Sequence, residues 1–361
     1  MTKRIVLTGG GTAGHVTPNI ALLPGLKSLG FEITYVGSFN GIEKKMIEAE
    51  GIPYHGVSSG KFRRNLDPKN IADVHNVFKG VREATRFLRE YRPDIVFSKG
   101  GYVAVPVVRA AGFLHIPVII HESDLTPGLA NRLCFRAANK ICCNFPETLE
   151  YLPKDKAVLS GSPIRADLLT GNRGRGLSFA GFSGEKPVLL MIGGSLGARK
   201  LNEVLRTALT ELLKSFDVIH IAGQGNLDPA LDNVPGYRQF EFIREELKDV
   251  FAASDIVFSR AGANAITELL ALKKPNLLVP LPKENSRGDQ ILNAASFEKQ
   301  GYSIVVDQKE LTAETLVQHL HTLYENREQY RKAMEKSPSG NGVNVILGLI
   351  GELTDHSLNR V

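Results

Sequence analysis

The chain has 361 residues, which is too long for one ordinary hydrophobic core and fits two domains of about 150 to 200 residues each. Hydrophobic residues make up 43% of the sequence and charged residues 23%, so the composition excludes a disordered or fibrous protein. The net charge of +6 and the isoelectric point near 9.1 favour an anionic partner, which could be nucleic acid, anionic lipid or a phosphorylated substrate.

No membrane-spanning helix or export signal is predicted. The longest apolar stretch, residues 103–120, is interrupted by Arg109, His115 and two prolines, and it falls short of the roughly 20 apolar residues that a span requires. A strand is expected already at residues 5–8, which leaves no room for an apolar signal core. We therefore expect the protein to stay in the cytosol.

Short runs rich in valine and isoleucine alternate with longer segments of helical period, from residue 4 to 158 and again from residue 188 onward. This alternation predicts parallel strands joined by crossover helices, as in doubly wound α/β domains. The strands are predicted at residues 5–8, 33–36, 95–98, 118–121, 188–192, 218–221, 256–259 and 276–280.

A glycine-rich loop follows the first predicted strand. Gly9, Gly11 and Gly14 form a G-x-G-x-x-G pattern, in which backbone amides and a helix N-terminus can face a phosphate. A dinucleotide site would also need an acidic residue at the end of the second strand to bind the ribose, and that strand ends in Val-Gly-Ser at residues 36–38. His15, directly after the loop, could remove a hydroxyl proton or contact a phosphate, or it could only cap the helix.

Residues 65–92 are predicted to form a long helix, preceded by Lys-Phe-Arg-Arg at residues 61–64. The helix could present a basic and apolar face to anionic lipid, but an ordinary amphipathic helix packed on the sheet is the simpler interpretation. The basic residues show none of the named motifs of nucleic-acid-binding modules, so nucleic acid is not expected as a partner. The side chains concerned are Val74, Val77, Phe78, Val81, Lys79, Arg82 and Arg86.

Polar residues end the strand predicted at residues 118–121, in the run His121-Glu122-Ser123-Asp124. Ligands of open parallel sheets bind at the carboxyl ends of the strands, where this run lies. Hydrogen bonding within the loop is the alternative role of His121 and Glu122.

Three cysteines, Cys134, Cys142 and Cys143, are odd in number and lack the C-x-x-C spacing of zinc and redox motifs. Reduced thiols packed in the interior are expected.

Turn-forming and glycine-rich segments mark the predicted domain boundaries. Gly161-Ser162-Pro163 is a hinge candidate between the two halves. Residues 170–184, rich in glycine and arginine, are expected to form an exposed loop. The run 337–342 interrupts the helical pattern before a last apolar helix at residues 343–353, which we expect to cross back onto the first domain. The predicted domains are therefore residues 1–162 with the C-terminal segment 340–361, and residues 163–339.

Two loops in the second half have the composition of a diphosphate site. In the run Gly193-Gly194-Ser195-Leu196-Gly197-Ala198, glycines permit close approach and Ser195 adds a hydroxyl donor, although the run could be only a tight turn. From Arg260 to Glu268, small residues let a ligand approach a helix start, whose amides and dipole suit a diphosphate. Glu268 could accept hydrogen bonds from both ribose hydroxyls, or it could only complement the helix dipole.

The two halves also repeat each other in sequence. Leu-Thr-Gly-Gly-Gly-Thr-Ala-Gly at residues 7–14 corresponds to Met-Ile-Gly-Gly-Ser-Leu-Gly-Ala at residues 191–198. Asp-Ile-Val-Phe-Ser at residues 94–98 recurs identically at residues 255–259. Two such matches in the same order, each where a strand gives way to a helix, predict two similar doubly wound domains.

Together these motifs closely resemble those of glycosyltransferase family 28, and within it the UDP-N-acetylglucosamine transferases that complete the disaccharide of the peptidoglycan precursor lipid II. The motifs span nearly the whole chain in the same order. They comprise residues 9–15 (Gly-Gly-Gly-Thr-Ala-Gly-His), 99–102 (Lys-Gly-Gly-Tyr), 121–124, 161–165 (Gly-Ser-Pro-Ile-Arg), 193–198 and 260–268.

The resemblance implies a GT-B fold, in which two Rossmann-like domains face each other across a cleft, the acceptor domain first and the UDP-sugar domain second. It implies no metal in the active site and no other cofactor, and the chain has no Asp-x-Asp metal motif. The implied substrates are UDP-N-acetylglucosamine and an undecaprenyl-linked muramyl-peptide lipid. The implied location is the cytoplasmic face of the cell membrane, with anionic inner-leaflet lipid and a cell-wall synthesis complex as further partners.

Carried over by position, the resemblance implies specific donor contacts. Where the family has a glutamine pair that binds the sugar hydroxyls, this chain has Asp289-Gln290, and Asp124 replaces the asparagine of the His-Glu-x-Asn motif. A carboxylate accepts hydrogen bonds but cannot donate them. Arg165 and the backbone of Ile243 would hold the uracil, and Ser195 the diphosphate. The implied donor-binding residues are Thr12, Ala13, Gly14, Asp124, Arg165, Ser195, Ile243, Ala263, Asn264, Ala265, Ile266, Thr267, Glu268, Asp289 and Gln290.

The implied reaction is one inverting displacement, in which a muramyl 4-hydroxyl attacks the anomeric carbon while helix-start amides stabilise the UDP leaving group. His15 is the first candidate to assist the hydroxyl, with Glu122 or Asp124 as the alternative. Three other functions remain open: a UDP-N-acetylglucosamine 2-epimerase of the same fold, a diacylglycerol glycosyltransferase, and a membrane-bound scaffold with decayed sugar loops. The intact glycines, Ser195 and Glu268 argue against the scaffold.

Overall fold

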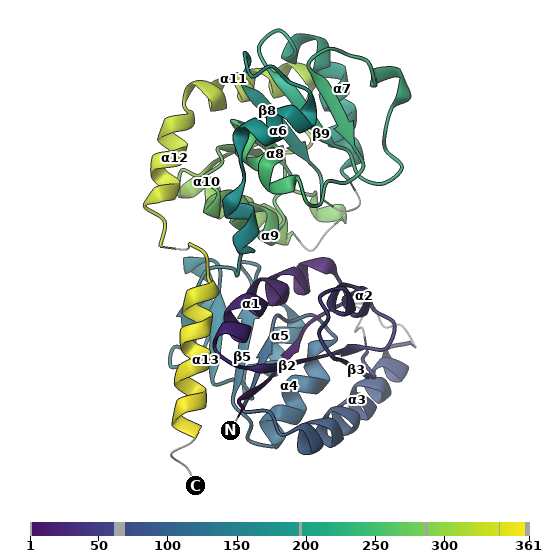
Figure 1. Cartoon of the computed structure of the whole chain (residues 1–361), viewed down its shortest axis with the longest axis vertical. Coiled ribbons are helices and arrows are strands. Elements are labelled where there is room, and N and C mark those ends of the chain that lie inside the picture. The colour runs from purple at the N-terminus through teal and green to yellow at the C-terminus, as the bar shows by residue number, and fades with distance from the viewer. Residues whose placement is uncertain (1, 61–68, 195–196, 286–287, 339, 358–361) are drawn as a thin grey trace. The chain divides into compact units, whose positions relative to one another are not determined.

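A computed structural model of the chain describes residues 2–60, 69–194, 197–285, 288–338 and 340–357. The chain divides into two units, one made of Met1–Arg165 and Ser339–Val361 and the other of Ala166–Pro338 (Figure 1). Within the described residues, no helix has both the length and the apolar character needed to cross a membrane.

The strands of the first unit are β1 (Arg4–Thr8), β2 (Glu32–Ser38), β3 (Tyr54–Val57), β4 (Ile95–Ser98), β5 (Val118–Glu122), β6 (Lys140–Cys143) and β7 (Ala157–Leu159). They form one sheet with the order β3-β2-β1-β4-β5-β6-β7. Each neighbouring pair in this sheet is parallel. Because the chain moves outward from β1 first in one direction and then in the other, the sheet is doubly wound, as predicted.

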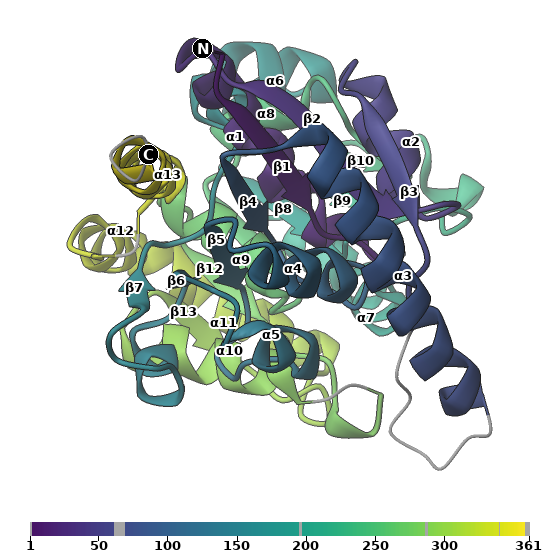
Figure 2. The ribbon, with the colours of Figure 1, turned by 90° about the horizontal axis from the view of Figure 1, so that it is seen from below.

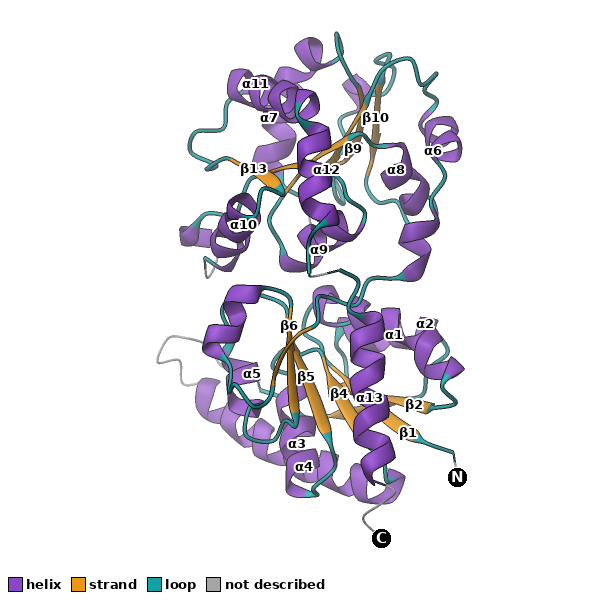
Figure 3. Cartoon of the chain, turned by 90° about the vertical axis from the view of Figure 1, so that its left-hand side faces the viewer, coloured by secondary structure: helices purple, strands orange, loops and turns teal. Residues whose placement is uncertain are grey.

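The helices of the first unit are η1 (Ala13–His15), α1 (Thr17–Ser28), α2 (Ile42–Ala49), α3 (Lys69–Tyr91), α4 (Ala104–Phe113), α5 (Leu129–Cys134), η2 (Pro146–Tyr151) and α13 (Val343–Ser357). Apolar side chains form two clusters on this sheet, one containing Leu22 and Leu26 of α1 and the other Leu88 of α3 and Val107 of α4. Figure 3 shows the strands between α1 and α13 on one side and α3, α4 and α5 on the other.

The last helix, α13, belongs to the first unit although it is the most distant from it in sequence. Ile346 and Ile350 are fully buried in the same apolar cluster as α1. The connection to α13 is fixed by Asn341, whose Oδ1 accepts a hydrogen bond from the backbone N–H of Ile164 at 3.1 Å. Figure 1 shows α13, in yellow, beside the purple α1. Helix α13 therefore completes the apolar core to which α1 contributes.

The strands of the second unit are β8 (Val188–Ile192), β9 (Asp217–Ile221), β10 (Tyr237–Phe240), β11 (Ile256–Ser259), β12 (Asn276–Leu278) and β13 (Ser303–Val305). They form a parallel sheet with the order β10-β9-β8-β11-β12-β13. The winding out from β8 repeats the winding out from β1. The helices are η3 (Ala166–Thr170), α6 (Arg173–Ala180), α7 (Arg199–Leu212), η4 (Pro229–Leu231), α8 (Leu247–Ala253), α9 (Ala263–Ala271), η5 (Lys283–Asn285), α10 (Asp289–Lys299), α11 (Ala313–Glu325) and α12 (Arg327–Glu335).

The repeated Asp-Ile-Val-Phe-Ser run has the same structural role in both units. Asp94 precedes β4, and its carboxylate accepts a hydrogen bond at 2.6 Å from the backbone N–H of Arg4, at the start of β1. Asp255 precedes β11 and accepts one at 2.8 Å from Val188, at the start of β8. The prediction of two similar doubly wound domains is confirmed, while their arrangement across a cleft stays a prediction.

Residues 170–184 are mostly exposed, as expected, but the expectation of a loop is wrong, because α6 occupies most of this segment. Arg175 donates two hydrogen bonds, of 3.1 and 3.0 Å, to the carboxylate of Asp249 on α8. A Cβ atom at Gly176 would lie 2.1 Å from the carbonyl oxygen of Asp249, so only glycine permits this approach of the helices. The glycines that suggested a loop serve helix packing instead.

The three cysteines are free and buried, as predicted. Burial raises the pKa of Cys134, Cys142 and Cys143 to about 12. The thiols therefore stay protonated at neutral pH and are poor nucleophiles.

Candidate functional site

In the first unit, the loops that follow β1, β4 and β5 meet at one edge of the sheet because these strands are neighbours. The loop after β1 passes through Thr12 into η1, which carries Ala13, Gly14 and the half-buried His15. The Nδ1 atom of His15 lies 3.0 Å from the Thr12 hydroxyl oxygen. This hydrogen bond orients the imidazole ring at the carboxyl edge of the sheet.

The loop after β4 lies directly against His15. Gly101 has a φ of +82°, and a Cβ atom there would lie 2.3 Å from the carbonyl oxygen of Gly10 and 3.2 Å from His15 Nδ1. A side chain at this position would therefore displace the first glycine loop. The structure thus brings the Lys-Gly-Gly-Tyr motif together with the motif that contains His15.

A buried carboxylate supports the first glycine loop. Glu43, on α2, is fully buried and accepts hydrogen bonds from the backbone N–H groups of Gly11 at 3.2 Å and Ser38 at 3.1 Å, and from the Ser38 hydroxyl. The acidic group that the end of the second strand lacks in sequence is thus supplied by the next helix. The Gly11 N–H therefore points at the Glu43 carboxylate. An acid in the first turn of the helix after the second strand is the signal that could have predicted this.

We expect Glu43→Ala to lower the free energy of unfolding by about 2 kcal/mol, because the N–H groups of Gly11 and Ser38 lose their acceptor. Urea unfolding followed by circular dichroism measures the loss. Lys44→Ala is the matched control, since Lys44 forms an exposed ion pair with Glu48 and is expected to change stability by less than about 0.5 kcal/mol. Equal midpoints for the two variants would contradict this role of Glu43.

The Glu122 side chain organises the loop after β5. Its carboxylate is buried and accepts hydrogen bonds from the backbone N–H groups of Ser123 (2.8 Å), Asp124 (3.0 Å) and Gly128 (3.0 Å) and from the Asn131 amide (2.9 Å). Burial raises the pKa of the Glu122 carboxyl, and the charge of Asp124 adds to the increase. With four donors on its two oxygens, this carboxylate is committed to shaping residues 123–131, a role in which Gly128 and Asn131 were not predicted.

His121 is fully buried beneath this loop. Its Nε2 atom lies 3.0 Å from the carbonyl oxygen of Gly161, and its Nδ1 atom lies 2.7 Å from Nζ of Lys99. Burial lowers the pKa of His121 well below its usual value, so the ring is neutral. These contacts connect the ends of β4 and β5 to the segment that follows β7.

In the second unit, the start of α9 carries the residues predicted for the diphosphate. A helix N-terminus directs its first backbone N–H groups out of the helix and bears a partial positive charge. Ala263 is buried, while Asn264, Ala265 and Glu268 are half-buried. The remaining predicted residues of α9 are Ile266, which is buried, and Thr267, whose hydroxyl donates to the carbonyl oxygen of Ala263 at 2.9 Å.

Arg260 joins the loops after β11 and β12. Its guanidinium group donates to the carbonyl oxygens of Val279 at 3.1 Å and Pro280 at 3.3 Å, and to the side chain of Gln308 at 2.7 Å. Gln290, near the start of α10, accepts a hydrogen bond at 3.0 Å from the backbone N–H of Leu281. The neighbouring strands β11 and β12 thus place α9 and the Asp289-Gln290 pair at one edge of the sheet.

Three other residues predicted to bind the donor belong neither to α9 nor to the loops after β11 and β12. Ile243 is buried in the loop after β10, at the edge of the second sheet away from β12. Arg165 is half-buried and is the last residue of the first unit before the chain enters the second. Ser195, like Leu196, lies outside the described residues.

An apolar groove of about 940 Å³ runs along α3 and α4 of the first unit. Figure 2 shows these two helices side by side. Phe78 is 66% exposed and Phe113 67% exposed, which is unusual for large apolar side chains. The predicted helix at residues 65–92 is thus present from Lys69 on, while residues 61–68 lie outside the described residues. The groove is lined by Val74, Val77, Phe78, Val81, Arg82, Thr85, Arg86, Arg89, Glu90, Val105, Arg109, Phe113 and Leu133.

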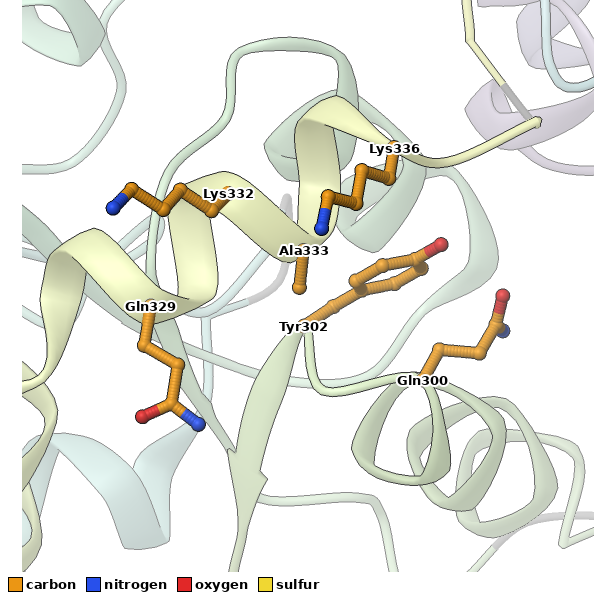
Figure 4. Close-up of a pocket in the computed structure, with 6 residues that line it drawn as sticks. All are labelled: Gln300, Tyr302, Gln329, Lys332, Ala333 and Lys336. Carbon is orange, nitrogen blue, oxygen red and sulfur yellow. The ribbon is translucent and has the colours of Figure 1, made fainter.

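A second hollow, of about 670 Å³, lies in the second unit between α12 and the segment from α10 to β13 (Figure 4). Its lining contains none of the predicted site residues. The residues are Gln300, Tyr302, Gln329, Lys332, Ala333 and Lys336.

Two doubly wound domains, each with a glycine-rich loop at the carboxyl edge of its sheet, define the class of GT-B glycosyltransferases. Residues 5–143 match the N-terminal domain of glycosyltransferase family 28, and residues 188–348 match its C-terminal domain. The chain belongs to this family and is therefore an enzyme that transfers a sugar.

Individual relatives indicate which sugar transferases this chain is most similar to. A protein of Lachnoclostridium phytofermentans, named UDP-N-acetylglucosamine--N-acetylmuramyl-(pentapeptide) pyrophosphoryl-undecaprenol N-acetylglucosamine transferase, is 60% identical over 351 residues, which cover 97% of this chain and 99% of that protein. The crystal structure of Acinetobacter baumannii MurG matches with a TM-score of 0.78 at 28% identity, covering 97% of this chain and 99% of that one. A UDP-GlcNAc 2-epimerase from Neisseria meningitidis, covering 97% of this chain and 100% of its own, has a TM-score of 0.64 at 15% identity and shares only the fold.

Proposed function

We propose that the protein transfers N-acetylglucosamine from UDP-N-acetylglucosamine to the 4-hydroxyl of the muramyl-peptide carrier lipid I, which forms lipid II. The identity of 60% across 97% of the chain with a transferase named for this reaction carries the proposal. The glycine-rich loops at residues 9–14 and 193–198 and the start of α9 are complete in this sequence, which supports an active enzyme.

The second unit would bind the donor. The N–H groups of Ala263 and Asn264 at the start of α9 would face the diphosphate, where the partial positive charge of the helix end stabilises the UDP leaving group. Ser195 would add a hydroxyl donor, and Glu268 would accept hydrogen bonds from the ribose. Arg165 and the backbone of Ile243 would hold the uracil. No metal or other cofactor is part of this proposal, in which the helix-end amides and the Ser195 hydroxyl would donate hydrogen bonds to the diphosphate.

The first unit would bind the acceptor and accept its proton. His15 is our candidate for the base, because its ring is oriented at the carboxyl edge by Thr12 and is not fully buried. Glu122 is committed to four hydrogen bonds within its loop, which favours Asp124 as the second candidate. A single displacement would invert the anomeric carbon and release UDP.

Radiolabelled UDP-N-acetylglucosamine, incubated with the full chain alone, with lipid I, or with diacylglycerol, tests the proposal. Label should enter lipid II and only in the presence of lipid I. An epimerised or hydrolysed sugar without acceptor would instead identify a 2-epimerase, and label on diacylglycerol would identify a glycolipid synthase. A protein that consumes no donor in any of the three mixtures would contradict the proposal outright.

The groove along α3 and α4 would hold the enzyme to the cytoplasmic face of the membrane, where its lipid acceptor lies. Exposed apolar side chains such as Phe78 and Phe113 can enter the acyl region, while Arg82, Arg86 and Arg109 meet anionic headgroups. Both features lie on one surface of one unit. The proposal of a partner in a cell-wall synthesis complex rests only on the resemblance to the family.

We expect Phe78→Asp to weaken binding to vesicles of phosphatidylglycerol and phosphatidylethanolamine by about tenfold, since it removes one large apolar side chain from the contact and adds a negative charge. Co-sedimentation measures the change. Leu227→Asp is the control, because Leu227 is an exposed apolar residue of the second unit that does not line the groove. Equal vesicle binding by the two variants would exclude the groove as the membrane contact.

A further inference from the structure

Lys99 is a buried cation that the reaction described above does not use. It follows β4 in the Lys-Gly-Gly-Tyr motif, and only 1% of its surface is exposed. Its amine lies 2.7 Å from Nδ1 of His121 and donates a hydrogen bond to the hydroxyl of Ser123. A lysine ammonium is strongly hydrated in water, so its burial between two uncharged groups costs stability.

The hydrogen bonds determine what Lys99 does to its neighbours. The Nε2–H of His121 donates to the carbonyl oxygen of Gly161, so Nδ1 carries the lone pair and needs a donor, which is Lys99. Lys99 also reaches Ser123, whose backbone N–H is held by Glu122. Lys99 therefore holds the side chains of His121 and Ser123, while the Glu122 carboxylate holds the backbone N–H groups of Ser123 and Asp124.

Charge gives a second reason for this position. Glu122 and Asp124 are two carboxylates two positions apart in the chain, and the charge of Asp124 adds to the rise in the pKa of Glu122. Lys99 is a cation close enough to interact electrostatically with both of them. A positive charge beneath the loop reduces the repulsion between these carboxylates.

Burial lowers the pKa of Lys99 to about 7, against the opposing effects of Glu122, Asp124 and Cys142. Between pH 7 and the ordinary pKa of a lysine, 10.5, the unfolded chain binds a proton that the folded chain does not. The stability of the protein should therefore rise with pH across this window. A group that lowers stability at neutral pH and lies beneath a candidate site is better explained by function than by packing.

We propose that Lys99 is a positioning residue of the acceptor site, which holds Ser123 and Asp124 in place through its hydrogen bonds and its charge. This inference rests on the proposed function, because it assumes that the loop after β5 contacts the acceptor sugar. Lys99 itself need not touch the substrate.

Lys99→Met is the test, since methionine has a similar length but no charge and no donor. We expect kcat/KM for lipid I to fall by about tenfold, while the Kd for UDP stays unchanged. Lys99→Arg, which keeps the charge and the donors, should restore part of the loss. In urea unfolding at several pH values, the stability of the wild type relative to Lys99→Met should increase from pH 7 towards pH 10. The pH profile of the variant's activity should also differ from that of the wild type, because the group with a pKa of about 7 has been removed.

Wild-type kcat/KM for lipid I in Lys99→Met, with an unchanged pH profile, would overturn the inference. If Lys99→Met does not fold, Ser123→Ala removes one partner of the amine and leaves the core intact. It should lower acceptor kcat/KM without changing UDP binding, and unaltered kinetics would again overturn the inference. A wild-type enzyme that does not use lipid I would refute the proposed function, whereas the pH-dependent stability difference would still report on Lys99.

Discussion

His15→Ala is expected to lower kcat for transfer to lipid I by about 10²- to 10⁴-fold, the usual contribution of a general base. The affinity for UDP-N-acetylglucosamine should hardly change, because most of the residues proposed to bind the donor belong to the second unit. His15 is half-buried, and its Nδ1 atom lies 3.0 Å from the Thr12 hydroxyl oxygen, which orients the ring. Steady-state kinetics with lipid I and calorimetric titration with UDP separate the two effects.

His319→Ala provides the control for His15, since His319 is a half-buried histidine on α11 of the second unit. Thr12→Val should cause a smaller loss than His15→Ala, because it removes the orienting hydrogen bond but leaves the base. If His15→Ala turns over at the wild-type rate, His15 is not the base, and Asp124→Asn becomes the variant to measure.

The second large effect is expected for Glu268→Ala, which should weaken the binding of UDP and of UDP-N-acetylglucosamine by about 100-fold. Two hydrogen bonds from ribose hydroxyls to a carboxylate would be lost, and each such charge-assisted bond contributes about 1.5 kcal/mol or more. Once donor is saturating, kcat should remain close to the wild-type value. Calorimetric titration with UDP measures the affinity directly.

Glu298→Ala is the matched control for Glu268, because it removes an exposed glutamate from the neighbouring helix α10. The competing role of Glu268 is to complement the dipole of α9. In that case Glu268→Ala would lower the melting temperature slightly and leave the Kd for UDP unchanged, and the assignment to the ribose would be wrong.

The strands that could be predicted from sequence are mostly the central ones. β1, β4, β5, β8 and β11 are covered on both faces, so they consist of continuous apolar runs. The edge strands β3, β7, β10 and β13 were not predicted, and neither was β6, the neighbour of β7. Tyr-His-Gly-Val in β3 and Tyr-Arg-Gln-Phe in β10 are less buried, so their apolar pattern is weak.

The site was predictable where it consists of short contiguous motifs and unpredictable where it depends on distant pairs. The motifs at residues 9–15, 121–124 and 260–268 were recognisable because each lies at one strand end. The contacts of Glu43 with Gly11 and of Lys99 with His121 join residues that are 32 and 22 positions apart. Such contacts depend on the order of the strands in the sheet, which cannot be read directly from the sequence. The α6 error has a similar cause, since only the position of α8 explains Gly176.

The placement of α13 has a consequence for biosynthesis. Leu22 and Leu26 of α1 share their apolar cluster with Ile346 and Ile350, which are translated only after the whole of the second unit. While the second unit is still emerging from the ribosome, α1 lacks the helix that covers it. A prematurely terminated chain would expose this apolar surface permanently, which makes it a target for chaperones and proteases. The apolar surface of α1 is therefore covered only once α13 has been translated.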